Sequence, residues 1–167
     1  MTVPRLARPL MNFLGSPRGA RIDAKAIRYT GHSPYSVLFR LDMRRPGAPP
    51  ASPYRPPLAL TTIGRRSGNL HTVGLAYYDV DGGWAVVGSA GGSPTEPHWV
   101  RNVRANPAAF VHLHRHTTPV LADVLEGAAK QPIWSMITAK VPLFEQFQAK
   151  IGRDIPIVVL RPRTARS

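Results

Sequence analysis

The chain has 167 residues, which favours one compact domain, and 43% of them are hydrophobic, which is enough to form a core. Because it contains no cysteine, disulfides, thiolate metal sites and a cysteine nucleophile are all excluded. The formal net charge of +13 favours an anionic partner such as a polyanionic cofactor, acidic lipid or nucleic acid. Most of this excess precedes residue 67, since residues 1–66 carry twelve Lys and Arg against two acids.

Residues 1–57 are expected to be peripheral to the core. Apolar residues recur there at helical spacings of three and four, which predicts a basic amphipathic helix with Leu6, Leu10, Phe13 and Leu14 on one face. That helix would dock on the domain or touch an anionic membrane. Residues 35–41 are expected to form a strand, and residues 46–57, with six prolines, a loop. No membrane span or signal peptide is recognisable, so we expect a cytoplasmic protein, at most peripheral to the inner face of the membrane.

Residues 58–162 read as short extended runs with two helical insertions. Strands are expected at 58–62, 70–78, 84–88, 110–113, 118–125 and 155–160, with a hairpin at Asp81-Gly82-Gly83. Helices are expected at 98–105 and at 131–149, the second divided by Pro142. The prediction is a mainly β, α+β domain: a small barrel or sheet of about six antiparallel strands with short helices packed on it, followed by a tail at 163–167.

The turn Thr61–Gly68 gathers hydrogen-bond donors between two of these strands. Arg65, Arg66 and Ser67 lie between two glycines, which permit a tight turn with exposed N–H groups. A surface turn can have the same composition, but the position between two apolar strands favours a binding site. Phosphate or carboxylate is the ligand that such donors prefer.

The stretch Gly88–Pro94 consists mostly of small residues and precedes the helix that is expected to begin at His98. Small residues would let a flat ring lie on the backbone, and exposed N–H groups could stabilise negative charge formed on its reduction. A flexible strand-to-helix loop is the alternative. In the helix, Trp99 and Val103 are expected to face inward, while Arg101 and Arg104 face outward or line a groove.

Three histidines alternate at positions 112, 114 and 116, which would place them on one face of a strand. Alternate residues of an extended strand lie nearly 7 Å apart, so the imidazoles would converge poorly on one ion. No acidic residue is near them in the sequence. We therefore expect no metal site and interpret these histidines as solvated residues near the end of a strand.

Five segments in this order carry a family resemblance: Thr61–Gly68, Gly88–Gly92, Pro97–Trp99, Asn102–Pro107 and Arg153–Val159. Together they resemble the deazaflavin-dependent nitroreductases, which use coenzyme F420, and the resemblance covers residues 58–162. It implies a split β-barrel and an oxidoreductase that passes a hydride from reduced deazaflavin to a quinone or a related acceptor. A non-catalytic F420-binding protein and a flavin mononucleotide (FMN) or haem split-barrel protein remain alternatives. A homodimer is left open, and no specific nucleic-acid partner is expected.

The resemblance also implies roles for individual residues. The cofactor's phosphate and tail would be held by Arg65, Arg66, Ser67 and Gly68, with His71 standing where the family often has an arginine. The deazaflavin ring would lie against Ser89, Ala90, Gly91, Pro97 and His98, with Trp99 bracing that wall. The proton would come from solvent, His71, Tyr77 or His98, and we take Tyr77 and His98 as the catalytic candidates.

Two departures from the family pattern concern the acceptor. Ala90 replaces a lysine of the nitro-reducing member, and Val141, Phe144 and Phe147 stand where that member presents tyrosines. The missing hydroxyl groups would leave an apolar pocket wall. An apolar planar acceptor such as a quinone is therefore expected in preference to a nitroimidazole.

Overall fold

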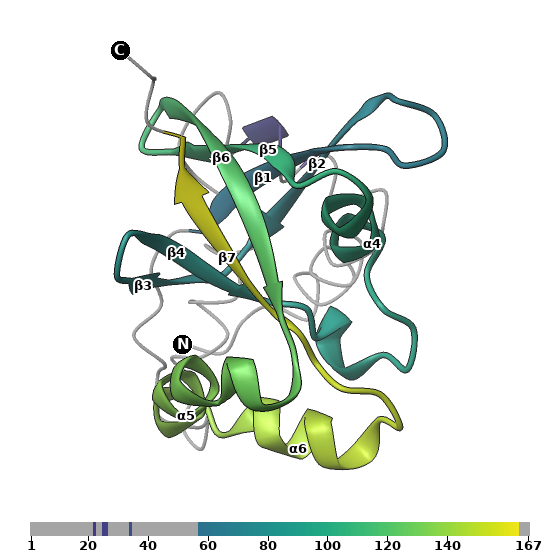
Figure 1. Ribbon diagram of the computed structural model, residues 1–167, viewed down its shortest axis with the longest axis vertical. Helices are drawn as coiled ribbons and strands as arrows, with labels where there is room; N and C mark the ends of the chain where they lie inside the picture. Colours follow the sequence, from purple (N-terminus) through teal and green to yellow (C-terminus); the bar gives the residue numbers. More distant parts are fainter. Residues whose placement is uncertain (1–21, 23–24, 27–33, 35–56, 164–167) are drawn as a thin grey trace, which may run out of the picture.

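Seven strands form one curled antiparallel sheet in the part of the chain that the structure describes (Figure 1). The computed structural model describes residues 22, 25–26, 34 and 57–163. The strands in chain order are β1 (Leu58–Ile63), β2 (Leu70–Leu75), β3 (Tyr77–Val80), β4 (Gly83–Val87), β5 (Ala108–Leu113), β6 (His116–Leu125) and β7 (Ile157–Pro162). Across the sheet their order is β2-β1-β5-β6-β7-β4-β3.

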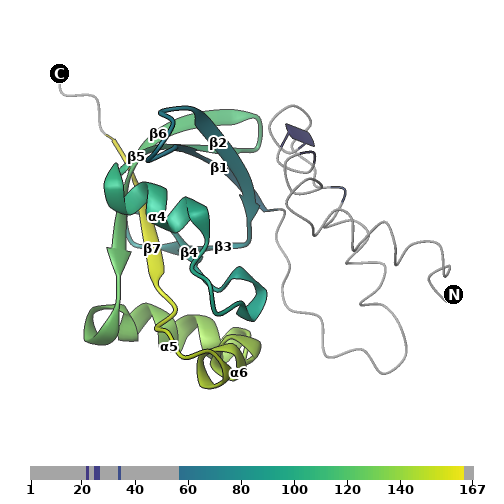
Figure 2. The same ribbon diagram turned by 90° about the vertical axis from the view of Figure 1, so that its right-hand side faces the viewer.

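The two edge strands of this sheet follow one another in the chain. Only Ala76 separates β2 from β3, so the backbone bends there from one edge of the sheet to the other. This bend brings the sheet round into a half-barrel (Figure 2). The prediction of a single strand over residues 70–78 is therefore wrong, because that segment contributes to both edges and is interrupted at Ala76.

The ten-residue strand β6 joins the two halves of the sheet. Residues 116–121 pair with β5 and residues 120–125 pair with β7. Its buried Val120 and Ala122 alternate with the exposed Pro119 and Leu121, as expected for a strand that presents one face to a core.

An apolar cluster fills the interior of the half-barrel. The helix α4 (His98–Ala105) lies between the β1–β2 hairpin and the β4–β7 pair, and it buries Trp99, Val100 and Val103 there (Figure 2). The strands contribute inward side chains that include Leu58, Leu60, Val86, Val111, Val158 and Leu160. The outward-facing Arg104 completes the amphipathic pattern predicted for residues 98–105, and the predicted bounds of this helix are confirmed.

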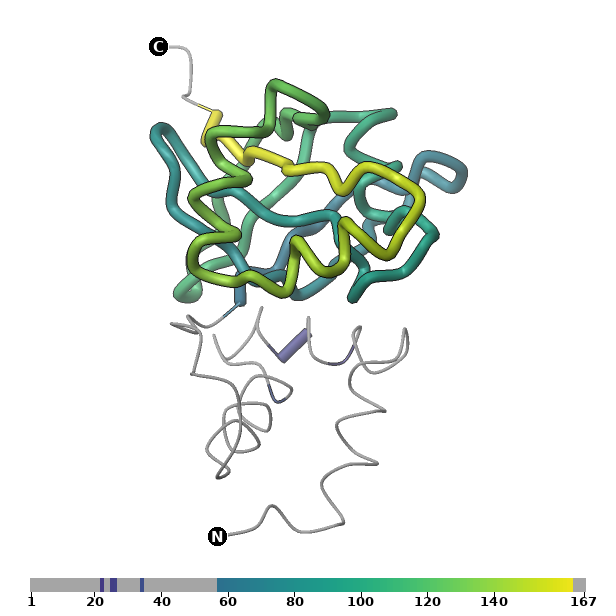
Figure 3. Tube along the Cα trace, turned by 90° about the horizontal axis from the view of Figure 1, so that it is seen from below, coloured from purple at the N-terminus to yellow at the C-terminus, as the bar shows by residue number. Residues whose placement is uncertain are grey.

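A second apolar cluster lies between the sheet and the helices α5 (Gln131–Lys140) and α6 (Leu143–Lys150), which run across one end of the molecule (Figure 3). Trp134, Ile137 and Ile157 are among its buried members. Pro142 separates the two helices, which confirms the predicted division, because proline supplies no N–H to continue α5. Two 3-10 turns, η1 (Ala90–Gly92) and η2 (Gly127–Lys130), complete the described elements. None of the described helices is long and apolar enough to cross a membrane.

The alternating histidines do not share a strand, so that expectation is wrong. The chain reverses at His114 and Arg115, whose φ angles of 49° and 68° form a turn between β5 and β6. His112 is consequently buried in β5, whereas His114 and His116 are exposed. The expected hairpin at Asp81–Gly83 is confirmed between β3 and β4. The predictions for residues 1–56 concern positions that, apart from four isolated ones, lie outside the described residues.

Candidate active site

The turn between β1 and β2 is a closed backbone loop. The N–H of Gly64 donates to the carbonyl of Asn69 at 2.7 Å, and the N–H of Gly68 donates to the carbonyl of Gly64 at 2.8 Å. Gly68 has a φ of 69°, in the region that favours glycine. Any side chain at Gly64 would place its Cβ 2.7 Å from Nε2 of His71, so the imidazole of His71 packs directly over this glycine.

Asn102 of α4 fixes the turn to the barrel. Its carbonyl oxygen accepts from the backbone N–H of Arg65 at 3.2 Å and from the guanidinium of the same residue at 3.3 Å. Its amide donates to Oγ1 of Thr62 at 3.1 Å. Asn102 is only 4% exposed, so these hydrogen bonds satisfy a polar group that lies in the protein interior.

A pocket of about 460 Å³ opens between this turn and α4. Its lining comes from the turn, from β2 and from one face of α4: Gly64, Arg65, Arg66, Ser67, His71, Thr72, Val73, His98, Trp99 and Asn102. Two guanidinium groups and two imidazoles are in this set, and no carboxylate is. The pocket therefore has the charge and the hydrogen-bond donors that suit an anionic ligand.

The amino end of α4 adds to this potential. Pro97 is its N-cap, no side chain caps the helix, and no acidic residue lies in its first turn. His98 and Trp99, the first two residues of the helix, both line the pocket. The positive end of the helix dipole thus borders the pocket, where it favours negative charge.

The small-residue loop that follows β4 has an unusual backbone. Ala90, Gly91 and Gly92 have φ angles of 51°, 64° and 81°, so three successive residues are left-handed. A Cβ at Gly92 would lie 2.7 Å from the ring of Phe147 in α6, whereas a Cβ at Gly91 would meet no atom of the described residues within 4 Å. The loop therefore packs against α6 on one side and is open on the other. Holding the non-glycine Ala90 in this conformation costs on the order of 1 kcal/mol.

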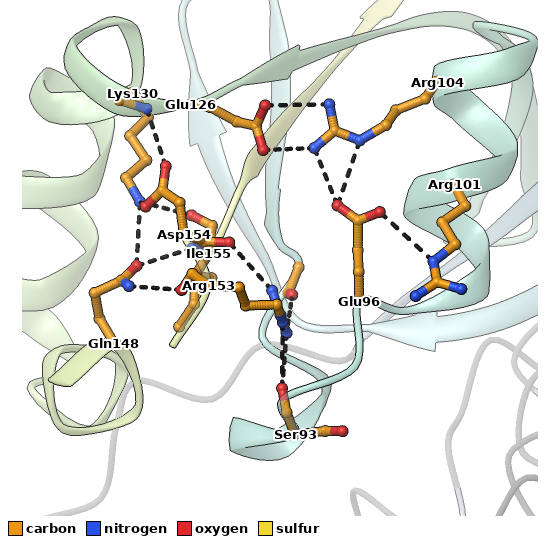
Figure 4. Close-up of polar contacts among 12 residues, drawn as sticks. Ser93, Glu96, Arg101, Arg104, Glu126, Lys130, Gln148, Arg153, Asp154 and Ile155 are labelled. Carbon is orange, nitrogen blue, oxygen red and sulfur yellow. Dashed lines mark hydrogen bonds and ion pairs between the residues drawn. The ribbon is translucent and has the colours of Figure 1, made fainter. Parts of the chain in front are cut away.

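Arg153 holds this loop from behind (Figure 4). Its guanidinium donates to the carbonyls of Gly88, Ser89 and Ser93, each at 3.1 Å through Nη2. Arg153 lies just before β7, and the loop follows β4, with which β7 pairs. These bonds occupy the loop's carbonyl oxygens and fix its course into α4.

A buried ion pair anchors the segment that carries Arg153 (Figure 4). Lys130 is 3% exposed, pairs with the carboxylate of Asp154, and donates to the carbonyl of Ile155 at 2.8 Å. Partial burial opposes ionisation of Asp154, but hydrogen bonds from the backbone N–H of Gly127 and from Lys130 outweigh it and lower the pKa of Asp154. Lys130 also lies 4.5 Å from the ring centroid of Trp134.

Arg104 forms a separate network on the surface (Figure 4). Its guanidinium pairs with Glu126 at 2.6 Å and with Glu96 at 3.0 Å. The side-chain hydrogen bond with Glu126 is the largest influence and raises the pKa of Arg104. The positive charge of Arg104 is therefore balanced by two carboxylates. Arg65 and Arg66 differ, because the described residues include no ion pair for either.

The structure brings most of the predicted cofactor-binding residues to this pocket. Its lining includes Arg65, Arg66, Ser67, His71, His98 and Trp99. Gly68 closes the same turn, while Ser89, Ala90, Gly91 and Pro97 belong to the adjoining loop that leads into α4.

Two groups of predicted residues lie elsewhere. Tyr77 is in the interior cluster and does not line the pocket. Phe144 and Phe147 pack edge-to-face, with ring centroids 6.4 Å apart, on the second core cluster, and Val141 ends α5 beside them. The ring of Phe147 supports the small-residue loop at Gly92. Their roles in catalysis and acceptor binding stay predictions.

Sequence reasoning assigned no role to Asn102 or Arg153. A signal for Asn102 was present, because it shares a helical face with Trp99 and Val103 and is a polar residue at a core-facing position. Arg153 lies in a short irregular segment without periodicity, and its partners are backbone carbonyls about 60 residues away, so no local pattern could identify them.

Known proteins resemble this chain in sequence and in fold. A family model described as F420H(2)-dependent quinone reductase matches residues 47–162. The chain belongs to this family. It is 28% identical over 127 residues to the F420H(2)-dependent quinone reductase Rv1261c of Mycobacterium tuberculosis (strain ATCC 25618 / H37Rv). The match covers 74% of this chain and 81% of that protein.

Solved structures support the family and the fold of this F420H(2)-dependent quinone reductase homologue. The F420-H2 dependent reductase FDR-A is 33% identical, with a TM-score of 0.57 over 64% of this chain and 95% of that one. A second structure, described as a domain-swapped dimer, is also 33% identical, with a TM-score of 0.58 over 65% of this chain and 81% of that one. The predicted family, the split β-barrel fold and the oxidoreductase class are confirmed.

Proposed function

We propose that this chain transfers a hydride from reduced coenzyme F420 to a quinone, with the pocket between the β1–β2 turn and α4 as the cofactor site. The observation that carries the proposal is the pocket's set of charges. Arg65 and Arg66 line it together with His71 and His98, and none of the described residues that line it carries a carboxylate. Coenzyme F420 has a phosphate and a tail of carboxylates, so its charge is complementary to this site.

The residues present fit such a cofactor. The guanidinium groups of Arg65 and Arg66 and the hydroxyl of Ser67 would bind the phosphate, and Asn102 holds Arg65 in place. Trp99 and Val73 supply apolar surface in the same pocket, and the open side of the loop at Gly91 leaves room for a flat ring. The bound reduced deazaflavin supplies the hydride, so the protein needs no nucleophile of its own.

The protein's contribution is to orient two rings and to shield them from water. Trp99 is 8% exposed and anchored in the interior cluster, so it gives the pocket a rigid wall. Arg153 binds the backbone carbonyls of the small-residue loop and so fixes the surface on which the ring would lie. An apolar planar acceptor such as a quinone suits this environment, and we propose menadione as a first test substrate.

Parallel titrations with coenzyme F420 and FMN test the cofactor assignment, and turnover of the reduced coenzyme with menadione tests the reaction. We expect tighter binding of coenzyme F420 and faster loss of the reduced-cofactor absorbance when enzyme is added. Replacing both Arg65 and Arg66 with Ala should weaken binding at least tenfold. Replacement of Arg115, which lies in the β5–β6 turn and does not line the pocket, is the matched control. Preference for FMN, or unchanged rates across a wide set of quinones, would contradict the proposal.

A further inference from the structure

Two polar side chains converge over Gly64 because this residue has no side chain of its own. The φ angle of Gly64 is not positive, unlike that of Gly68, so the backbone conformation does not require a glycine at this position. A Cβ there would lie 2.7 Å from Nε2 of His71 and 2.8 Å from Oγ of Ser67. Any side chain at Gly64 would therefore prevent these two polar atoms from approaching the turn together.

The imidazole of His71 is on the face of β2 that borders the pocket. His71 pairs with Thr62, whose hydroxyl accepts a hydrogen bond from Asn102 of α4, so the side chains of this pair lie on the α4 face of the sheet. His71 lines the pocket and is exposed to solvent. Among the described residues, neither ring nitrogen has a hydrogen-bond or ion-pair partner. Both nitrogens can therefore bind a ligand that enters the pocket.

The charged and titratable groups that share the pocket with His71 are all cations or potential cations. Arg65 and Arg66 come from the turn, and His98 is the first residue of α4. None of the described residues that line the pocket carries a carboxylate. A proton on His71 thus finds no counter-ion in this lining, and an anionic ligand would supply one.

We propose that His71 and Ser67 form an anion subsite over Gly64, and that binding of the coenzyme there takes up a proton at His71. This coupling rests on the proposed function, since its ligand is the anionic part of coenzyme F420. Histidine is the side chain that changes charge near neutral pH. A bound anion favours the imidazolium form, and the imidazolium in turn strengthens anion binding. The affinity for the coenzyme should therefore fall as the pH rises and His71 loses its proton.

Charge distinguishes this subsite from a neutral hydrogen bond. A neutral imidazole can also donate from Nε2, but it adds no charge and its binding takes up no proton. His71→Gln keeps a neutral donor, whereas His71→Arg keeps a permanent cation. Both replacements remove the coupling to protons, and they should affect affinity in opposite ways.

Coenzyme titrations of the full chain at about pH 6 and about pH 8 test the coupling. At the lower pH, the wild type should bind about fivefold more tightly than His71→Gln, the upper range for an exposed ion pair, and at the higher pH the two should bind about equally. His71→Arg should match the wild type at the lower pH and exceed it at the higher pH. Comparison of variants at one pH cancels any ionisation of the coenzyme itself. His114→Gln is the matched control, because His114 is an exposed histidine of the β5–β6 turn that does not line the pocket.

Isothermal titration calorimetry counts the protons. Binding enthalpies in buffers that differ in their enthalpy of ionisation give the number of protons taken up with each coenzyme bound. The wild type and His114→Gln should take up a fraction of a proton more than either His71 variant. Equal uptake in the wild type and His71→Gln would refute the coupling, and so would a loss of uptake in His98→Gln that His71→Gln does not show.

Sulfate tests the subsite without the coenzyme. This anion does not titrate near neutral pH, and NMR of the imidazole nitrogens at about pH 7 reports the charge of each histidine. We expect sulfate to move the nitrogen signals of His71 toward those of imidazolium, and to move them further than those of His114. No response at His71 would refute the subsite even in an active enzyme. Failure of the wild type to bind the coenzyme would instead refute the proposed function, and the response to sulfate would then decide alone whether the subsite exists.

Discussion

Asn102 is the residue whose replacement tests the architecture of the pocket most directly. Asn102→Ala removes the acceptor of two hydrogen bonds from Arg65 and the donor to Thr62. Thr62 is fully buried, so its hydroxyl loses a partner that water cannot replace easily, at about 1–3 kcal/mol. Arg65 is only half-buried, and water can solvate its freed groups. We therefore expect a total loss of about 2 kcal/mol in the free energy of unfolding.

Asn102→Asp provides a matched comparison. The carboxylate keeps the acceptor for Arg65, and the hydroxyl of Thr62 can donate to it instead of accepting, so the stability loss should be smaller than for Asn102→Ala. The new negative charge lies at the lining of the pocket, however, and should weaken binding of coenzyme F420 at least tenfold.

Urea denaturation gives the stability of both variants, and fluorescence titration with oxidised coenzyme F420 gives their affinity. The reasoning predicts opposite rankings: Asn102→Ala is the less stable variant, and Asn102→Asp is the weaker binder. Wild-type stability in Asn102→Ala would show that the three hydrogen bonds contribute nothing net. Undiminished affinity in Asn102→Asp would show that the anion binds elsewhere.

Three further predictions concern the frame of the site. Gly92→Ala should lower the free energy of unfolding by at least 2 kcal/mol, because its Cβ would collide with Phe147. Gly91→Ala should lower it only by the strain of a left-handed alanine, about 1 kcal/mol. Thermal denaturation measures both, and equal losses would contradict this packing. Lys130→Met should cost about 3 kcal/mol, since it removes the partner of Asp154 and two further hydrogen bonds. The pKa of Asp154 is lowered, so its contribution is present above about pH 4 and lost as the pH falls further; chemical denaturation from pH 6 to pH 2 should show a shallower loss in Lys130→Met than in the wild type. Burial raises the pKa of Tyr78 to about 12, so its neutral form is retained in the folded state while the unfolded chain ionises near pH 10. Stability should therefore fall between these two pH values, a loss that Tyr78→Phe should remove, and absorbance titration of the native protein should show a tyrosine that ionises near pH 12 and is missing in Tyr78→Phe.

The sequence predicted the fold where local chemistry decides it. Helix α4 was placed to the residue because Asn106-Pro107 ends it and its apolar positions repeat at helical spacing. Pro142 likewise divided α5 from α6. The β2–β3 bend at Ala76 escaped prediction because no turn residue marks it. The bend is imposed by the pairing of β2 with β1 and of β3 with β4, which are contacts made at a distance.

The site was predictable to the same extent and for the same reason. Arg65, Arg66 and Ser67 form one contiguous motif, so their convergence needs only a tight turn. Joining them to His98 and Trp99 required the family resemblance, because α4 follows three intervening strands. The burial of His112 could not be foreseen, since His112 is one of three alternating histidines in the sequence and only the turn at His114 separates them.

Strand β6 determines how far apart the two parts of the site can be. The turn between β1 and β2 is connected to it through β1 and β5, and the small-residue loop is connected to it through β4 and β7. β6 overlaps with both partners only at Val120 and Leu121, so this short segment transmits the position of one part to the other. A slip of one residue there would turn every inward side chain outward. The distance between these two parts of the proposed cofactor site is thus set by the register of a strand that contributes residues to neither part.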